Sequence, residues 1–218
     1  MSLPYHLEPL QSKWPAFSGN VYCIGRNYAD HAKELGNEVP TEPVIFLKAP
    51  SALRQLAEGP LAFADETFHH ELELCLLVGR RLEKAADVTA DAVIAVSLGL
   101  DLTRRAVQDQ LKKNGLPWTT AKRFAGSGVL APFVDADGLD LTQTDLQLEI
   151  NGELKQAGNT KDMIFPCVTI LRYLTQFQSL QPGDIIFTGT PAGVGPIRQG
   201  DRIRVFSRSM GLDALGVL

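Results

Sequence analysis

Short apolar runs bounded by polar or glycine-rich stretches recur along the chain, and this pattern predicts β-strands. The predicted strands cover residues 21–25, 44–48, 70–78, 96–102, 184–188 and 202–206. Other stretches carry the wider apolar spacing and the end signals that are typical of helices. The predicted helices cover residues 27–36, 87–95, 105–115 and 163–177.

The clearest local signal lies at residues 146–156, where two alternating segments flank Asn151-Gly152. This dipeptide favours the two positive-φ positions of a type I′ turn, so we expect a β-hairpin there. Many non-local strands with a few inserted helices predict an α+β, mainly β fold and not a doubly wound α/β sheet.

Two acids interrupt the predicted strand H-E-L-E-L-C-L-L-V. Glu71 and Glu73 fall on the same face of a strand, with their Cβ atoms roughly 6–7 Å apart. Asp101 is a third acid inside an apolar strand, in L-G-L-D-L. Three carboxylates can share one hard divalent cation such as Mg²⁺, Ca²⁺ or Mn²⁺.

The alternation alone leaves a second interpretation open, because alternate acids also mark the solvent-exposed face of an edge strand. The apolar continuation of the strand and the placement of Asp101 favour the metal site. His69 and His70 precede the acids. Because His70 lies on the opposite face of the strand, we expect the two histidines to support the site and not to bind the ion.

The composition is that of an ordinary globular protein, with 218 residues, 44% hydrophobic and 21% charged. A net charge of −4 and the absence of basic runs argue against a nucleic-acid partner. No apolar run approaches the roughly 20 residues that span a bilayer, and no signal peptide is visible, so a cytoplasmic location is expected. The three cysteines, Cys23, Cys75 and Cys167, are expected to be reduced and buried.

Several polar residues carry weaker signals. His31 and Glu34 stand three positions apart in a predicted helix, a spacing that suits a general base but is also common in surface pairs. Lys48 and Lys122, judged by their local sequence alone, are expected at the surface. G-T-P-A-G-V-G-P at residues 189–196 is glycine-rich but lacks the lysine of a nucleotide-binding P-loop, so nucleotide binding is not expected.

Taken together, the motifs resemble those of the fumarylacetoacetate hydrolase family, and of its short branch that acts on acylpyruvates and oxaloacetate. Typical segments are G-R-N-Y-A-D-H-A-K-E, H-H-E-L-E-L and G-D-I-I-F-T-G-T-P-A-G-V-G-P. The resemblance runs in order through residues 25–34, 42–48, 69–74, 100–103, 107–109, 112–124, 150–153, 163–165 and 183–196. It extends from about residue 19 to residue 205, which suggests an N-terminal arm at 1–18 and a single catalytic domain at 19–218.

The resemblance implies a strand-rich, β-roll-like fold with a few short helices and a metal near its mouth. It implies Mg²⁺ or Mn²⁺ bound by Glu71, Glu73 and Asp101. It also implies a small keto-acid substrate and a homodimer. The other residues to which it gives roles are His31 and Glu34 at a water, Lys122 at the enolate, and Arg105, Gln108 and Thr190 at the substrate carboxylate and oxyanion.

The reaction implied first is hydrolysis of a C–C bond in acylpyruvates through a metal-stabilised enolate. Tautomerisation or decarboxylation of oxaloacetate, and 2-hydroxyhepta-2,4-diene-1,7-dioate isomerisation, are alternatives at the same site. A catalytically weak protein that binds a metal and a keto acid is an alternative of another class. It is motivated by Arg104 and Ala106, where the family commonly has a small residue and an acid.

Overall fold

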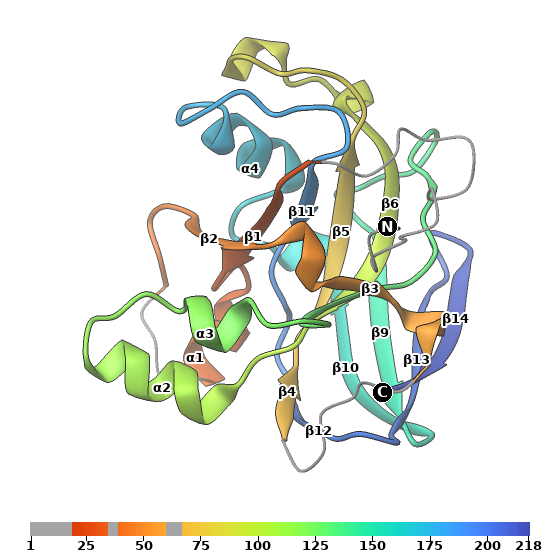
Figure 1. Cartoon of the computed structure of the whole chain (residues 1–218). Helices are drawn as coiled ribbons and strands as arrows, with labels where there is room; N and C mark the ends of the chain where they lie inside the picture. Colours follow the sequence, from red (N-terminus) through yellow and green to blue (C-terminus); the bar gives the residue numbers. More distant parts are fainter. Residues whose placement is uncertain (1–18, 35–38, 60–66) are drawn as a thin grey trace, which may run out of the picture.

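The part of the chain that the structure describes forms three β-sheets and four short α-helices, and the strands far outweigh the helices (Figure 1). The structure is a computed structural model that describes residues 19–34, 39–59 and 67–218. The fold is therefore α+β and mainly β, as expected. The predicted N-terminal arm at 1–18 and the predicted helix end at Gly36 lie outside the described residues.

The largest sheet is eight-stranded, in the order β2-β1-β11-β5-β6-β7-β3 with β8 paired to β6. It mixes parallel and antiparallel pairs: β1 runs parallel to β11, whereas β5 and β6 are antiparallel. Its strands are β1 (Val21–Gly25), β2 (Val44–Lys48), β3 (Leu53–Gln55), β5 (Leu72–Val78), β6 (Val93–Asp101), β7 (Gly128–Leu130), β8 (Val134–Asp135) and β11 (Ile185–Phe187).

A second sheet of four strands has the order β10-β9-β13-β14. The predicted hairpin is β9 (Asp145–Ile150) and β10 (Glu153–Asn159), and both turn residues have positive φ, 54° for Asn151 and 84° for Gly152. β13 (Arg202–Ser207) pairs with β14 (Leu212–Val217), so the C-terminal stretch forms the last strand of this sheet. A third sheet pairs β4 (Phe68–His70) with β12 (Gly195–Ile197).

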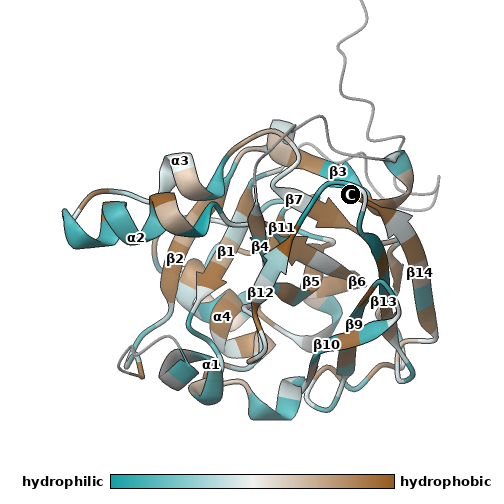
Figure 2. Cartoon of the chain, turned by 90° about the horizontal axis from the view of Figure 1, so that it is seen from below, coloured by the Kyte–Doolittle hydropathy of each residue, from teal (hydrophilic) through white to brown (hydrophobic). Residues whose placement is uncertain are grey.

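β5 and β6 are buried on both faces. One face packs Leu72, Leu74 and Leu76 into the main apolar core. The opposite face joins a smaller cluster that includes Cys75 and Leu77. Figure 2 shows both strands in brown near the centre of the molecule.

The helices are α1 (Ala29–Glu34), α2 (Arg105–Lys113), α3 (Thr119–Lys122) and α4 (Cys167–Leu174). The helix predicted at 87–95 is wrong: two single-turn 3₁₀ segments lead into β6, which begins at Val93. The helix predicted at 163–177 is shorter and begins after Pro166. The three cysteines are buried and free, and no helix in the described part of the chain is long and apolar enough to cross a membrane.

Candidate active site

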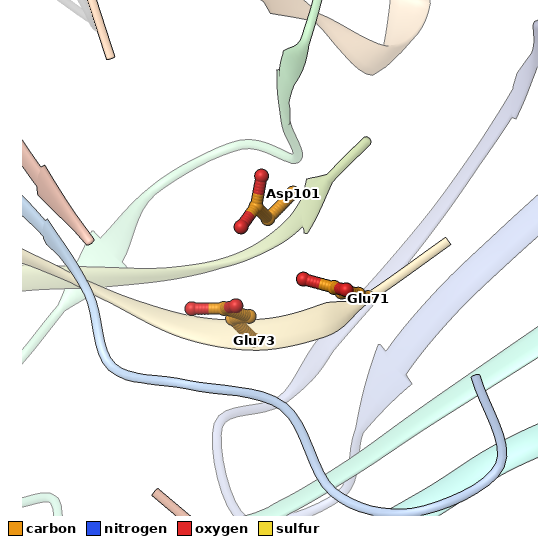
Figure 3. A group of neighbouring side chains, drawn as sticks. All are labelled: Glu71, Glu73 and Asp101. Atoms are coloured by element: carbon orange, nitrogen blue, oxygen red, sulfur yellow. The ribbon is translucent and has the colours of Figure 1, made fainter. Parts of the chain in front are cut away.

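The three acids predicted from the strand pattern converge on one point (Figure 3). Glu71 directly precedes β5, Glu73 lies within it, and Asp101 is the last residue of the neighbouring strand β6. The Asp101 N–H donates to the Glu71 carbonyl at 2.9 Å, which brings the two strands together at this point. All three acids are buried, and each offers an oxygen within 4.8 Å of the others.

Backbone geometry holds Glu73 in place. The N–H of Gly189 donates to Glu73 Oε2 at 2.6 Å. Gly189 has a φ of 99°, and a Cβ there would lie 2.6 Å from the Cβ of Asn27. Only glycine therefore fits at this position without a shift, and the glycine-rich loop after β11 supplies one of the site's fixed dipoles.

Two buried lysines neutralise the acids. The Lys122 ammonium donates to Glu71 Oε2 at 2.5 Å, to Asp101 Oδ2 at 2.7 Å and to Thr103 Oγ1 at 2.6 Å. Lys48 Nζ lies 2.7 Å from Asp101 Oδ1 and donates to the Lys122 carbonyl at 2.5 Å. The expectation that Lys48 and Lys122 lie at the surface is therefore wrong, because each is only 3% exposed.

Arg105 is the third cationic side chain at the cluster of acids. Its guanidinium donates to Glu71 Oε1 and to Gln108 Oε1, the latter at 2.6 Å. A further, longer contact of 3.5 Å joins Arg105 to His69 Nδ1. Three partners orient Arg105 even though Ala106 replaces the acid expected from the family pattern.

Burial and neighbouring charges set the protonation of the acids. Burial raises the pKa of Glu71, but Lys122 and Arg105 outweigh it and hold that pKa well below its usual range. Burial, followed by the charges of Asp101 and Glu71, raises the pKa of Glu73 well above its usual range. Glu71 is therefore ionised, whereas Glu73 takes up a proton more readily than an ordinary glutamate, and a bound cation would favour its ionised form.

Asn27 anchors the segment that carries His31. Its side-chain amide donates to the carbonyls of Thr188 and Phe165 and accepts from the Phe165 N–H at 2.7 Å. His31 follows on α1, with Nδ1 3.2 Å from Glu34 Oε2. Burial lowers the pKa of His31 despite the opposing charge of Glu71 and the bond to Glu34, so the imidazole is neutral at pH 7.

Gln156 is a buried residue of the site that no sequence pattern singles out. Its Oε1 accepts from the Leu72 N–H and pairs with His70 Nδ1, both at 2.9 Å. Its Nε2 donates to Thr190 Oγ1 at 2.8 Å and to the Pro191 carbonyl at 2.9 Å. Two backbone groups thus fix the amide orientation, and the Thr190 hydroxyl itself makes only a long donation of 3.4 Å to the Pro191 carbonyl, which a ligand can replace.

One pocket unites almost all of the predicted residues. Glu34 is the exception: it holds His31 and accepts hydrogen bonds from the Gly193 N–H but does not line the pocket. Arg26 and Lys112 also line it and were not predicted. The predicted residues in its wall are His31, Glu71, Glu73, Asp101, Arg105, Gln108, Lys122 and Thr190.

The donor set fits a hard divalent cation. Its ligands are carboxylate oxygens, which Mg²⁺ and Mn²⁺ prefer over softer donors. All three acids are buried, and a bound cation would offset their charge together with Lys48, which lies 2.7 Å from Asp101 Oδ1.

The fold and the acid cluster together define a member of the fumarylacetoacetate hydrolase family. The family described as fumarylacetoacetate (FAA) hydrolase C-terminal matches residues 20–215, and the chain belongs to it. The resemblance drawn from the motifs is confirmed.

Individual relatives include oxaloacetate tautomerases. The chain is 43% identical over 200 residues to the bovine mitochondrial oxaloacetate tautomerase FAHD1, covering 90% of each protein. It is 43% identical over 190 residues to oxaloacetate tautomerase YcgM of Escherichia coli, covering 85% of this chain and 86% of that protein. One relative is named mitochondrial and the other is bacterial, so the cytoplasmic location stays a prediction.

A structural relative contains a metal. Fumarylpyruvate hydrolase from Pseudomonas aeruginosa, in complex with Mn²⁺ and pyruvate, matches with a TM-score of 0.83 and 30% identity. The match covers 91% of this chain and 88% of that one. Relatives of this chain thus include both a tautomerase and a hydrolase.

Proposed function

We propose that the chain is a divalent-metal-dependent enzyme for small β-keto acids, and that keto–enol tautomerisation of oxaloacetate is its best-supported reaction. The observation that carries the proposal is the buried Lys122 ammonium, which lies within 2.7 Å of two of the three converging carboxylates. A cation site and a proton donor therefore share one pocket. The oxaloacetate tautomerases among the relatives support the choice of substrate.

Glu71, Glu73 and Asp101 would hold Mg²⁺ or Mn²⁺. When bound, the ion supplies a Lewis acid that polarises the keto group and stabilises negative charge on its oxygen. Glu71 and Asp101 form ion pairs with the Lys122 ammonium, and they would share their negative charge between this ammonium and the bound ion.

The chain's own residues perform the remaining work. Arg105 and the Thr190 hydroxyl bind the carboxylate next to the keto group, and Gln108, oriented by Arg105, donates from its amide nitrogen. Burial lowers the pKa of Lys122, but the charges of Asp101 and Glu71 outweigh burial and raise that pKa above its usual value. The side chain is therefore an ammonium. A water takes the proton that leaves the carbon beside the keto group, and the ammonium donates to the keto oxygen as the enolate forms and supplies its proton in the enol; solvent then returns a proton to Lys122.

Hydrolysis of acylpyruvates is the second candidate, favoured by the pair of His31 and Glu34. A neutral imidazole that lines the pocket can take a proton from a water, and the carboxylate 3.2 Å away stabilises the imidazolium that results. Decarboxylation of oxaloacetate and isomerisation of 2-hydroxyhepta-2,4-diene-1,7-dioate need the same enolate stabilisation without attack by water.

A homodimer remains part of the proposal. It is supported by β2, an edge strand of the large sheet, whose Leu47 is 52% exposed. An exposed apolar edge strand favours pairing with a second copy. Light scattering on the eluting protein tests this, and a monomer mass across the working concentration range would reject it.

The reaction is tested with Mg²⁺-loaded protein on two substrates, oxaloacetate and acetylpyruvate. Metal-dependent acceleration of oxaloacetate enolisation above the buffer rate is the expected result. Tight binding of oxalate without turnover of either substrate would instead identify a metal- and keto-acid-binding protein, the alternative that Arg104 and Ala106 motivated.

A further inference from the structure

Two basic side chains in the pocket wall are not needed to neutralise the acids. Lys48, Lys122 and Arg105 already contact the three-acid cluster. Arg26 and Lys112 line the same pocket. Within the described parts of the chain neither of them forms an ion pair, so the wall carries positive charge beyond what the acids require.

We infer that Arg26 and Lys112 form a subsite for the second carboxylate of a keto dicarboxylic acid. This inference rests on the proposed function and sharpens it, because it names the residues that would select a dicarboxylate over a monocarboxylate. A ligand with one carboxylate beside its keto group is served by Arg105, Gln108 and Thr190. Only a ligand with another anionic group uses the two additional bases.

The two bases come from distant parts of the chain. Arg26 directly follows β1, and Lys112 lies in the last turn of α2. Burial lowers the pKa of Lys112, and the charges of Arg105 and Arg26 lower it further against the opposing pull of Asp109 and Glu71. Like charges brought together in this way repel one another, and a bound anion relieves the repulsion.

The backbone of Arg26 supports the same interpretation. Its φ is 59°, in the left-handed region that non-glycine residues seldom adopt. The neighbouring Asn27, fixed by its bonds to Thr188 and Phe165, holds the chain in this conformation. A strained conformation maintained by its surroundings at a pocket wall is typical of residues that contact ligands.

Lys112 is held beside the pocket by an aromatic side chain. Its Nζ lies 5.4 Å from the ring centroid of Trp118, which also lines the pocket. Trp118 in turn packs edge-on against Phe46, with ring centroids 5.8 Å apart. This arrangement keeps the ammonium close to the cavity, and because it forms no ion pair with the described residues it is available to a carboxylate.

The test compares a dicarboxylate with a monocarboxylate on the Mg²⁺-loaded protein. The variants are Arg26→Gln, Lys112→Met and the double substitution. Lys113→Met is the matched control, because Lys113 is the next residue of α2, is exposed and does not line the pocket. The measured quantity is kcat/KM for oxaloacetate divided by kcat/KM for acetylpyruvate.

We expect this ratio to fall about tenfold for each single substitution, the size of one lost charge-assisted contact, and further for the double one. Lys113→Met should leave it unchanged. An unchanged ratio in the double variant, or an equal loss for both substrates, would overturn the subsite.

A binding measurement keeps the inference separate from the proposed reaction. If the wild-type protein turns over neither substrate, the proposed function fails. Calorimetry with oxaloacetate and pyruvate then decides the subsite alone. Preferential binding of oxaloacetate that is lost in the double variant supports it, and equal preference in both proteins rejects it.

Discussion

Two clusters in this protein each join one basic side chain to two carboxylates, and they differ in burial. On the second sheet, Arg204 lies 3.3 Å from Glu149 and 2.7 Å from Asp213, and its side chain is 38% exposed. At the pocket, Lys122 lies 2.5 Å from Glu71 and 2.7 Å from Asp101, and its side chain is 3% exposed. The local geometry is alike, but the surroundings are not.

Exposure to water sets the strength of the charge interactions in each cluster. Around Arg204 it screens the charges, so such a pair contributes only about 0–1 kcal/mol to stability. Around Lys122 the charges have lost most of their hydration, so each depends on its partners and all respond strongly to an added ion or substrate. The comparison explains why the buried cluster, and not the exposed one, is the candidate for chemistry.

The largest effect is expected from Lys122→Met. Loss of the ammonium should lower kcat for every reaction that passes through an enolate by about 10³-fold. It also leaves Glu71 and Asp101 with less counter-charge, which should lower the free energy of unfolding of the metal-free protein by about 3–5 kcal/mol. Steady-state kinetics and chemical denaturation measure the two effects, and retained activity would remove Lys122 from the mechanism.

His31→Ala should lower acetylpyruvate hydrolysis by about 10²-fold while sparing oxaloacetate tautomerisation. Equal loss of both reactions would show that His31 does not activate water. The pH profile gives a second check. Because the pKa of His31 is lowered below 6.5, the neutral base is present at pH 7, and the hydrolysis rate should fall only as the pH drops below about 6.5.

Gln156→Glu should act on substrate binding through Thr190. It removes the N–H donors to Thr190 and the Pro191 carbonyl while keeping the shape of the side chain. We expect KM for oxaloacetate to rise about tenfold with a smaller change in kcat. If the effect passes through the Thr190 hydroxyl, Gln156→Glu should raise KM little further in a protein that already carries Thr190→Val. Additive losses in the double variant would contradict this.

The smallest effect is expected from Arg204→Ala, which breaks the exposed cluster. It should change the free energy of unfolding by less than about 1 kcal/mol and leave both reactions unchanged. Chemical denaturation and steady-state kinetics on Arg204→Ala and Lys122→Met, measured side by side, compare the two clusters. A loss of activity here would show that burial is not what separates the two clusters.

Structural features that depend on residues close together in the sequence could be predicted. The Asn151-Gly152 hairpin and the paired acids of β5 are local patterns, and both are present in the structure. The segment 87–95 was assigned wrongly, because a run such as A-D-A-V-I-A fits the end of a helix and the start of a buried strand equally well.

Residues whose role depends on distant contacts could not be placed in this way. Lys48 is neutralised by Asp101, which lies 53 positions further along the chain. Gln156 is buried because a register shift between Leu154 and Gln156 turns the two to different surroundings: Leu154 is 57% exposed and Gln156 1%. Strict alternation would have placed both on one face.

Calorimetric titration of Mg²⁺ into metal-free protein tests the central claim, that the buried acids form a cation site. Wild-type protein should bind one Mg²⁺, and more tightly as the pH rises, because burial and the charges of Asp101 and Glu71 raise the pKa of Glu73 and a proton therefore competes with the ion for this carboxylate. Glu73→Gln should abolish this binding, and Glu149→Gln in the exposed cluster should not. Unchanged Mg²⁺ affinity in Glu73→Gln would contradict the account.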